Sequence, residues 1–319
     1  MTSISEVRGN RPSPRSWNWV GIVPFLLFST AFLLGPAVIL LVRSFQANEG
    51  GWTLFNYRQL TDPQVLEAYG LSVRISLVTA IIGGLFGFLM AWAVIYGGLP
   101  RPFRSLLTTF SGVASNFAGV PLAAAFIFTL GRIGLITALF GFFGVELYQT
   151  GFSLYNFWGL SVVYMFFQFP LMVLTITPAL EGLKKEWKEA SENLGATSWQ
   201  YWRHVALPVL LPSILGTIIL LFGNAFGAHA TAYALTGGTL RLATILIGAQ
   251  ISGDVLQNQG LGYAVAMGMV VIMGISITIY TVLQRRAERW LGGPSLPLRL
   301  PSRPPPRPSP PPGPGLAAR

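Results

Sequence analysis

The chain has 319 residues, of which 52% are hydrophobic and only 10% are charged. Soluble domains carry about 25% charged residues, so this composition excludes an ordinary water-facing domain. The net charge of +10 does not indicate nucleic-acid binding, because the basic residues lie in short segments between apolar runs. The sequence has no Cys and only two His, which excludes disulfides and Cys-ligated metals and argues against a His-based metal site.

Six apolar stretches are long enough to cross a bilayer, whose core of about 30 Å requires about 20 helical residues. They cover 19–43, 69–97, 105–130, 155–178, 209–235 and 258–284. The segment 131–154 is apolar but interrupted by Gly, and we predict a short interfacial or re-entrant helix there. The expected fold class is therefore an all-α membrane protein with six transmembrane helices in one domain, residues 19–290.

The basic residues predict the orientation of these spans. Sixteen of the 21 Lys and Arg lie in the two terminal segments and in the loops after the second and fourth spans, and five lie on the other side. Short cytoplasmic loops are enriched in Lys and Arg. Both termini are therefore expected in the cytoplasm, which agrees with an even number of spans.

The two terminal segments are expected to lie outside the membrane domain. Residues 1–18 form a cytoplasmic N-terminal segment, and residues 291–319 contain the run PSRPPPRPSPPPGPG. Proline cannot continue a helix, so this composition favours a solvated, disordered tail with some attraction to anionic membrane lipid. A partner that recognises proline-rich segments is the alternative.

The cytoplasmic loop 179–208 is charged and helical in pattern. Pro178 suits a first helical position with Thr177 as its N-cap, and apolar residues then recur at spacings of three and four. Gly195 suits a left-handed helix end. Beyond it, T-x-x-Q at 197–200 predicts the capping box of a second short helix, which Pro208 and Pro212 end. By pattern alone, such a loop can equally lie on the membrane surface.

The same loop resembles the signature E-A-A-x3-G-x9-I-x-L-P of permease subunits of binding-protein-dependent ABC importers. The matching positions are Glu189, Ala190, Ser191, Gly195, Val205, Leu207 and Pro208. Ser191 replaces an alanine of the signature, and Val205 replaces an isoleucine. The resemblance covers roughly residues 65–285. The stretches ATAYALTGG and GLGYAVAMG look most like the spermidine/putrescine-type branch, which implies a small, polyamine-like solute.

The resemblance implies the type I importer permease fold and a multi-pass protein of the bacterial inner membrane. It implies that 179–208 contains a coupling helix, with Glu189 as an ionic contact, that docks on a dimer of ATP-binding cassette ATPases. It also implies a second permease subunit, identical or different, and an extracytoplasmic solute-binding protein. The chain itself is expected to be no enzyme and to need no cofactor. Its three Lys follow no Gly-rich loop, so no nucleotide-binding P-loop is present.

Polar residues within the spans are candidates for the translocation path, because they are costly in a membrane. They are Asn116, Gln168, Asn224 and His229. Alternatively, each bonds to a neighbouring helix. Gly83 and Gly87 form a G-x-x-x-G pair that predicts close helix packing. The alternative function is a secondary transporter driven by an ion gradient, which predicts paired intramembrane charges and broken helices.

Overall fold

The computed structural model describes residues 22–47, 50–252 and 258–291, with side chains up to residue 285. The N-terminal segment 1–18 and the proline-rich tail beyond residue 291 lie outside the described residues. Within the described part of the chain, the secondary structure is helical except for one isolated antiparallel bridge between Gln46 and Trp52. This agrees with the predicted all-α fold.

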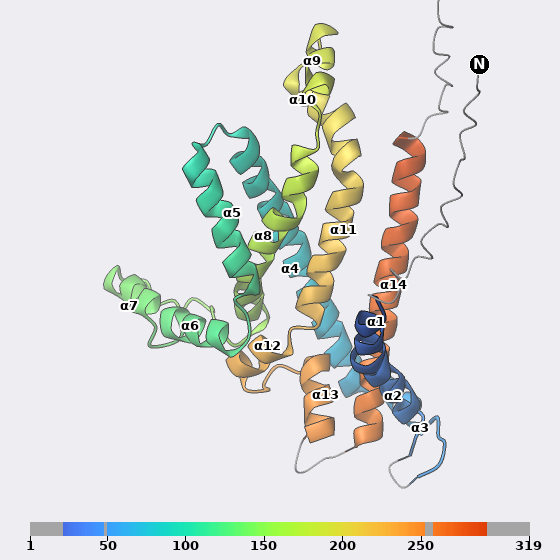
Figure 1. Cartoon of the computed structure of the whole chain (residues 1–319). Coiled ribbons are helices and arrows are strands. Elements are labelled where there is room, and N and C mark those ends of the chain that lie inside the picture. The colour runs from blue at the N-terminus through green and yellow to red at the C-terminus, as the bar shows by residue number, and fades with distance from the viewer. Residues whose placement is uncertain (1–21, 48–49, 253–257, 292–319) are drawn as a thin grey trace, which may run out of the picture.

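Three long helices, α4, α8 and α11, form the centre of the structure (Figure 1), and they span Pro63–Tyr96, Phe157–Glu181 and Leu207–Phe226. On their flanks, α5 packs against α8, while α14 packs against α11 and α2. The flanking helices are α2 (Gly35–Ser44), α5 (Arg101–Asn116) and α14 (Gln259–Leu291), and α1 (Val23–Ser29) precedes α2 in the same apolar segment. The short α3 (Phe55–Arg58) lies at the end opposite to α9 (Lys185–Asn193) and α10 (Ser198–Tyr201).

Six helical segments are long and apolar enough to span a membrane. The first, Val23–Ser44, has none of its apolar window buried inside the protein, and the sixth, Gln259–Arg285, has 6%. Apolar helices that expose this much surface need lipid or a partner protein around them. The predicted number of spans is confirmed.

The predicted close packing at Gly83 and Gly87 joins α4 to α8. A Cβ atom added to Gly83 would lie 2.7 Å from Cβ of Gln168. One added to Gly87 would lie 2.6 Å from Cβ of Met172 and 2.8 Å from the carbonyl oxygen of Phe169. No side chain fits there without moving the helices apart, so these glycines set the separation of the two central helices.

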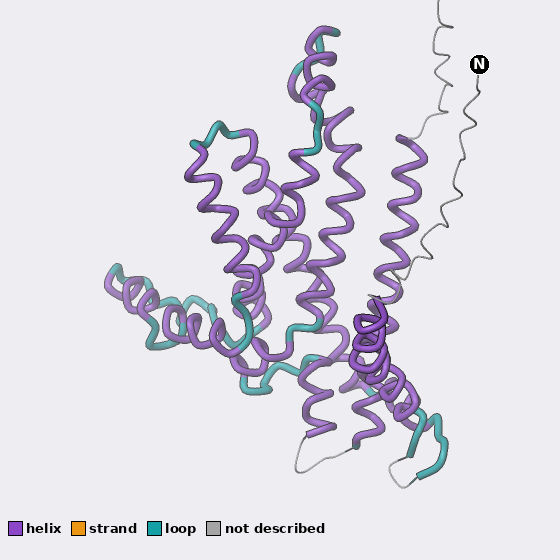
Figure 2. The backbone as a smooth tube through the Cα atoms, viewed as in Figure 1, coloured by secondary structure: helices purple, strands orange, loops and turns teal. Residues whose placement is uncertain are grey.

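Two of the predicted spans are not continuous helices, because each is broken into two (Figure 2). In the stretch 105–130, α5 ends at Asn116 and α6 (Val120–Leu130) begins after Gly119, whose φ is +77°. In the stretch 209–235, α11 ends at Phe226 and α12 (His229–Thr236) begins after a two-residue break. Figure 1 shows α6 and the helix that follows it in the chain, α7 (Leu135–Phe142), running across the direction of the central helices.

The third candidate span therefore differs from the predicted one. By length and apolar composition it is 120–142, which combines α6 and α7, whereas α5 is the element that lies along α8. The predicted short helix in 131–154 is present as α7. Between α12 and α14, the ten-residue helix α13 (Ala243–Ser252) adds a further short apolar element at the same end of the bundle.

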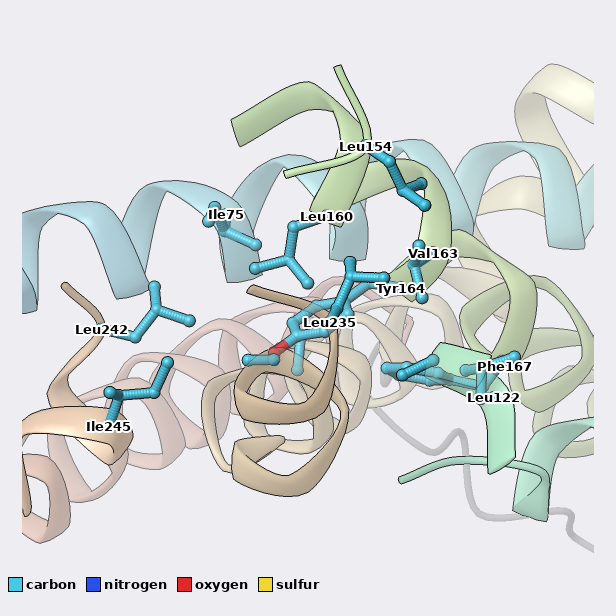
Figure 3. Close-up of a cluster of buried hydrophobic side chains, with 13 residues drawn as sticks. Ile75, Leu122, Leu154, Leu160, Val163, Tyr164, Phe167, Leu235, Leu242 and Ile245 are labelled. Atoms are coloured by element: carbon cyan, nitrogen blue, oxygen red, sulfur yellow. The ribbon is translucent and has the colours of Figure 1, made fainter. Parts of the chain in front are cut away.

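A cluster of buried side chains holds these short helices against the bundle (Figure 3). Leu122 of α6 and Leu235 of α12 pack with Tyr164 and Phe167 of α8. The breaks in the two spans are thus ordered parts of the core rather than frayed helix ends.

Candidate functional site

The loop that carries the signature begins after Glu181, the last residue of α8, and so starts later in the sequence than predicted. The prediction that a new helix begins at Pro178 with Thr177 as its N-cap is wrong, because α8 continues to Glu181. The hydroxyl of Thr177 donates to the carbonyl of Val173 instead, at 2.6 Å. Leu180 is fully buried, and its carbonyl accepts a hydrogen bond from Tyr96 at 2.8 Å. These tertiary contacts hold the last turn of α8 in place.

Gly195 forms the left-handed turn that follows α9, as the sequence predicts. Gly195 has a φ of +77°, which glycine adopts without steric cost. The amide of Gly195 donates to the carbonyl of Glu192 at 2.9 Å, and the amide of Ala196 donates to that of Ser191 at 3.0 Å. This pair of bonds is a Schellman motif, which satisfies the terminal carbonyls and fixes the direction of the chain leaving the helix.

The predicted capping box of the second helix is confirmed. Gln200 donates its amide N–H to Oγ1 of Thr197 at 3.3 Å, and the amide of Thr197 donates to Oε1 of Gln200 at 2.7 Å. Pro208 and Pro212 do not end this helix, contrary to the prediction, since it runs from α10 into α11.

A π-helical turn, Trp202–Ala206, carries this helix past Pro208. Within it the amide of Leu207 bonds to the carbonyl of Trp202, five residues back. A π-turn relieves the clash between a proline ring and the preceding turn. The same arrangement, at Thr30–Leu34, precedes Pro36 and joins α1 to α2. The second loop helix, α10, is therefore continuous with α11.

Both ends of the signature meet in one apolar groove. It encloses about 340 Å³ and is lined by Trp187, Ala190, Ser191, Leu194, Val205 and Val209. The hydroxyl of Ser191 donates to the carbonyl of Lys188 at 2.7 Å, so its polar atom is satisfied within α9. Leu194, at the edge of this groove, is 88% exposed. An apolar side chain so exposed on a polar loop is typical of a protein interface.

The charged face of α9 is exposed to solvent. Nζ of Lys185 lies 3.0 Å from a carboxylate oxygen of Glu189, one helical turn away. The hydrogen bond and charge of Glu189 raise the pKa of Lys185. Such exposed pairs add little to stability, so Glu189 remains available to a partner.

An aromatic cluster that the sequence analysis missed fixes the loop to α4. The ring of Trp202 meets those of Trp92 and Tyr96 edge-on, with centroids 6.1 and 5.6 Å apart. Trp92 and Tyr96 lie four residues apart at the end of α4, which is the spacing that puts both on one helix face. That spacing was the signal available in the sequence.

At the opposite end, three of the four predicted path residues line one open pocket. It has a volume of about 620 Å³ and lies where the α5–α6 break meets the α11–α12 break. Asn116 ends α5, Asn224 lies in the last turn of α11, and His229 begins α12. The predicted pairing of Asn224 with His229 on one pathway is compatible with this placement.

Hydrogen bonds hold both breaks around this pocket. The amide of Gly119 donates to Oγ1 of Thr231 at 2.7 Å and ties the first break to α12. The hydroxyl of the buried Tyr164 donates to the carbonyl of Ala228 at 2.7 Å and ties the second break to α8. Residues from four helices are thus fixed around one cavity.

Gln168 does not belong to this pocket. Its side chain is fully buried between α4, α8 and α11, and Nε2 donates to the carbonyl of Leu221 at 3.0 Å. Thr79 lies at 3.5 Å from the same nitrogen. A buried amide with these contacts joins helices, which is the alternative that the sequence left open for each of the four residues.

Comparisons with known proteins agree with the fold and with the family resemblance. Residues 22–289 match the family described as "Binding-protein-dependent transport system inner membrane component". The sulfate transport system permease protein CysT of Escherichia coli (strain K12) is 31% identical over 217 residues, which is 66% of this chain and 72% of CysT. CysW of the same organism is 28% identical over 292 residues, covering 90% of this chain and 95% of CysW.

Solved structures show the same fold. A chain of a bacterial ABC transporter that imports the acidic polysaccharide alginate superposes with a TM-score of 0.67 at 15% identity, over 84% of this chain and 95% of that chain. The MetNI methionine ABC transporter gives 0.51 at 18% identity, over 71% and 99%. The broken helices expected of a secondary transporter are present, but the family match does not favour that alternative. Over most of its length, this chain belongs to the family of inner-membrane permease subunits of binding-protein-dependent ABC importers.

Proposed function

We propose that this permease receives the motion of its ATPase subunits through α9, Gly195 and α10, and that its cargo is a small oxyanion of the sulfate class. Permeases of this family act with separate ATPase subunits, a second permease and a solute-binding protein, so the chain performs no ATP hydrolysis itself. The observation that carries the coupling role is the shape of the loop. Its exposed apolar residues lie on two short helices joined by a fixed turn and continuous with α11.

The distribution of charge supports a cytoplasmic position for this loop. The start of α5, with Arg101 and Arg104, lies at the end of the bundle that carries α9 and its lysines, whereas α3, which ends with Arg58, lies at the other end. By the positive-inside rule, this distribution supports a cytoplasmic location for α9 and for both termini. The pocket at the α5–α6 and α11–α12 breaks faces the outer side, where a binding protein delivers its cargo.

Replacing Leu194 with aspartate should reduce recovery of the ATPase with the purified permease by about tenfold or more. Burial of a leucine side chain contributes about 1.5–3 kcal/mol to an interface, and an unpaired carboxylate adds a desolvation cost. The measurement is co-purification from membranes in detergent, with the amount of inserted permease determined in parallel.

Leu54→Asp is the matched control, because Leu54 is 64% exposed at the opposite end of the bundle. It occupies the N-cap position of α3, where aspartate is tolerated. This control should retain the ATPase. Equal retention by Leu194→Asp and Leu54→Asp would exclude α9 as the docking element.

The cargo proposal rests on the relatives and on the pocket. CysT and CysW are sulfate permeases, and the polyamine-type interpretation finds no support among the relatives reported above. The residues lining the pocket include no Asp or Glu, whereas a cationic polyamine would gain from buried carboxylates. A lining of neutral donors suits an anion that accepts hydrogen bonds.

Uptake by the complete transporter decides the cargo class. Cells or vesicles containing the permease pair, the ATPase and the binding protein should accumulate labelled sulfate and not labelled putrescine. Putrescine uptake without sulfate uptake would restore the polyamine interpretation and leave the coupling proposal untouched.

A further inference from the structure

The pocket contains two polar side chains that the fold does not use. Asn224 and His229 are exposed, and in the described ranges neither side chain forms a hydrogen bond within the chain. An amide or imidazole left without a partner in a membrane protein is costly. Because both groups are exposed on the isolated chain, water, the second permease or a passing solute supplies their partner. Asn116 differs, because its Nδ2 already donates to the carbonyl of Gly112 at 2.9 Å.

The imidazole of His229 is held in position by its surroundings. Its ring stacks on that of Tyr233, with centroids 5.7 Å apart and an interplanar angle of 21°. On α13, Gly248 leaves the space that the imidazole occupies, since a Cβ atom there would lie 3.2 Å from Cε1 of His229. A ring fixed between two short helices is a pre-organised donor, which loses little entropy when it binds a ligand.

The chemistry of the pocket selects for a hydrogen-bond acceptor. The amide of Asn224 and the ring N–H of His229 are donors that reach the same cavity, and no carboxylate lines it. Phe167 supplies an apolar wall, which lowers the local dielectric and strengthens hydrogen bonds to a charged ligand. The volume of about 620 Å³ accommodates a small tetrahedral ion with some of its water.

We propose that Asn224 and His229 form a transient binding site for the oxyanion on the outer side of the translocation path. This inference rests on the proposed sulfate-class cargo and extends it to two named side chains. The site is used after release from the binding protein, so it determines the rate of translocation rather than the affinity for external solute. No covalent step is involved.

The test uses the complete transporter in proteoliposomes, with loaded binding protein outside and labelled sulfate as the probe. Asn224→Leu and His229→Leu should each reduce the kcat of sulfate uptake by about tenfold, because each removes a hydrogen bond to a charged ligand, and such bonds are stronger than those between neutral groups. The KM for external sulfate should change by less than about twofold, since the binding protein sets it. His229→Gln keeps a donor and should remain within about threefold of the wild type.

Two further measurements separate a path role from a structural one. ATP hydrolysis stimulated by the loaded binding protein should persist in the leucine variants, because docking and coupling involve other elements. Gln149→Leu is the matched control, an exposed amide on the α7–α8 loop outside the pocket, and it should transport normally.

Each contrary outcome identifies which proposal fails. Wild-type sulfate uptake with unaffected Asn224→Leu and His229→Leu variants would overturn the binding site alone. Loss of subunit assembly together with uptake in these variants would assign the residues to packing and also overturn it. A wild-type transporter that assembles and hydrolyses ATP but moves no sulfate would overturn the cargo proposal, and this inference with it.

Discussion

Replacing Gly87 with alanine should destabilise the purified permease by about 2 kcal/mol, even though it adds a single methyl group. The new Cβ atom would lie 2.6 Å from Cβ of Met172 and 2.8 Å from the backbone oxygen of Phe169. A backbone atom cannot rotate away, so α4 and α8 must separate, and overpacking of this kind costs about 1–3 kcal/mol. The measurement is the thermal unfolding midpoint in one detergent.

Gly274→Ala is the control, and it should not lower the stability of the permease. Gly274 also lies inside a long helix, α14, but an added Cβ atom would have no neighbour within 4 Å. Alanine is favoured over glycine in a helix by about 0.5–1 kcal/mol, so this variant should be as stable as the wild type or more stable. If both variants behaved alike, the close approach of α4 and α8 would not be a source of stability.

Gly195→Val should reduce uptake by about tenfold or more while leaving insertion into the membrane unchanged. A left-handed conformation costs a residue with a Cβ atom about 1–2 kcal/mol, and a β-branched residue more. The chain relieves this strain by opening the turn after α9, which changes the direction of α10 relative to α9. The measurement is solute uptake together with ATP hydrolysis stimulated by the binding protein.

Two variants separate the turn geometry from general strain. Gly195→Asn should keep most of the uptake, because asparagine tolerates the left-handed region. Gly98 has a φ of +69° in the α4–α5 loop at the same end of the bundle, with no atom within 4 Å of an added Cβ. Gly98→Val carries the same strain without touching the α9–α10 loop, and should transport normally. Full uptake by Gly195→Val would show that the turn is dispensable.

The local features of the loop were predictable because neighbouring residues determine them. A helix end at Gly195 and a capping box at Thr197 and Gln200 depend on backbone groups only a few residues apart. The start of the loop was not predictable in this way. Proline is common at the first position of a helix, which suggested a helix start at Pro178. The burial of Leu180 instead extends α8 beyond this residue.

The sequence by itself determined the class of the protein, the number of spans and the position of the loop that carries the signature. Each follows from hydropathy over about 20 residues or from fixed spacings within one segment. Hydropathy does not report where an apolar helix turns. The breaks after Asn116 and Phe226 lie inside apolar stretches and are stabilised by contacts between residues distant in sequence, Gly119 with Thr231 and Tyr164 with Ala228.

Only the tertiary structure distinguished the candidate path residues from one another. Asn116, Gln168, Asn224 and His229 are equivalent as polar residues in apolar stretches. Packing buries Gln168 against the carbonyl of Leu221 and leaves Asn224 and His229 open to a shared cavity. The physical reason is that the cost of a polar side chain depends on its partners, and those partners are determined by which helices meet.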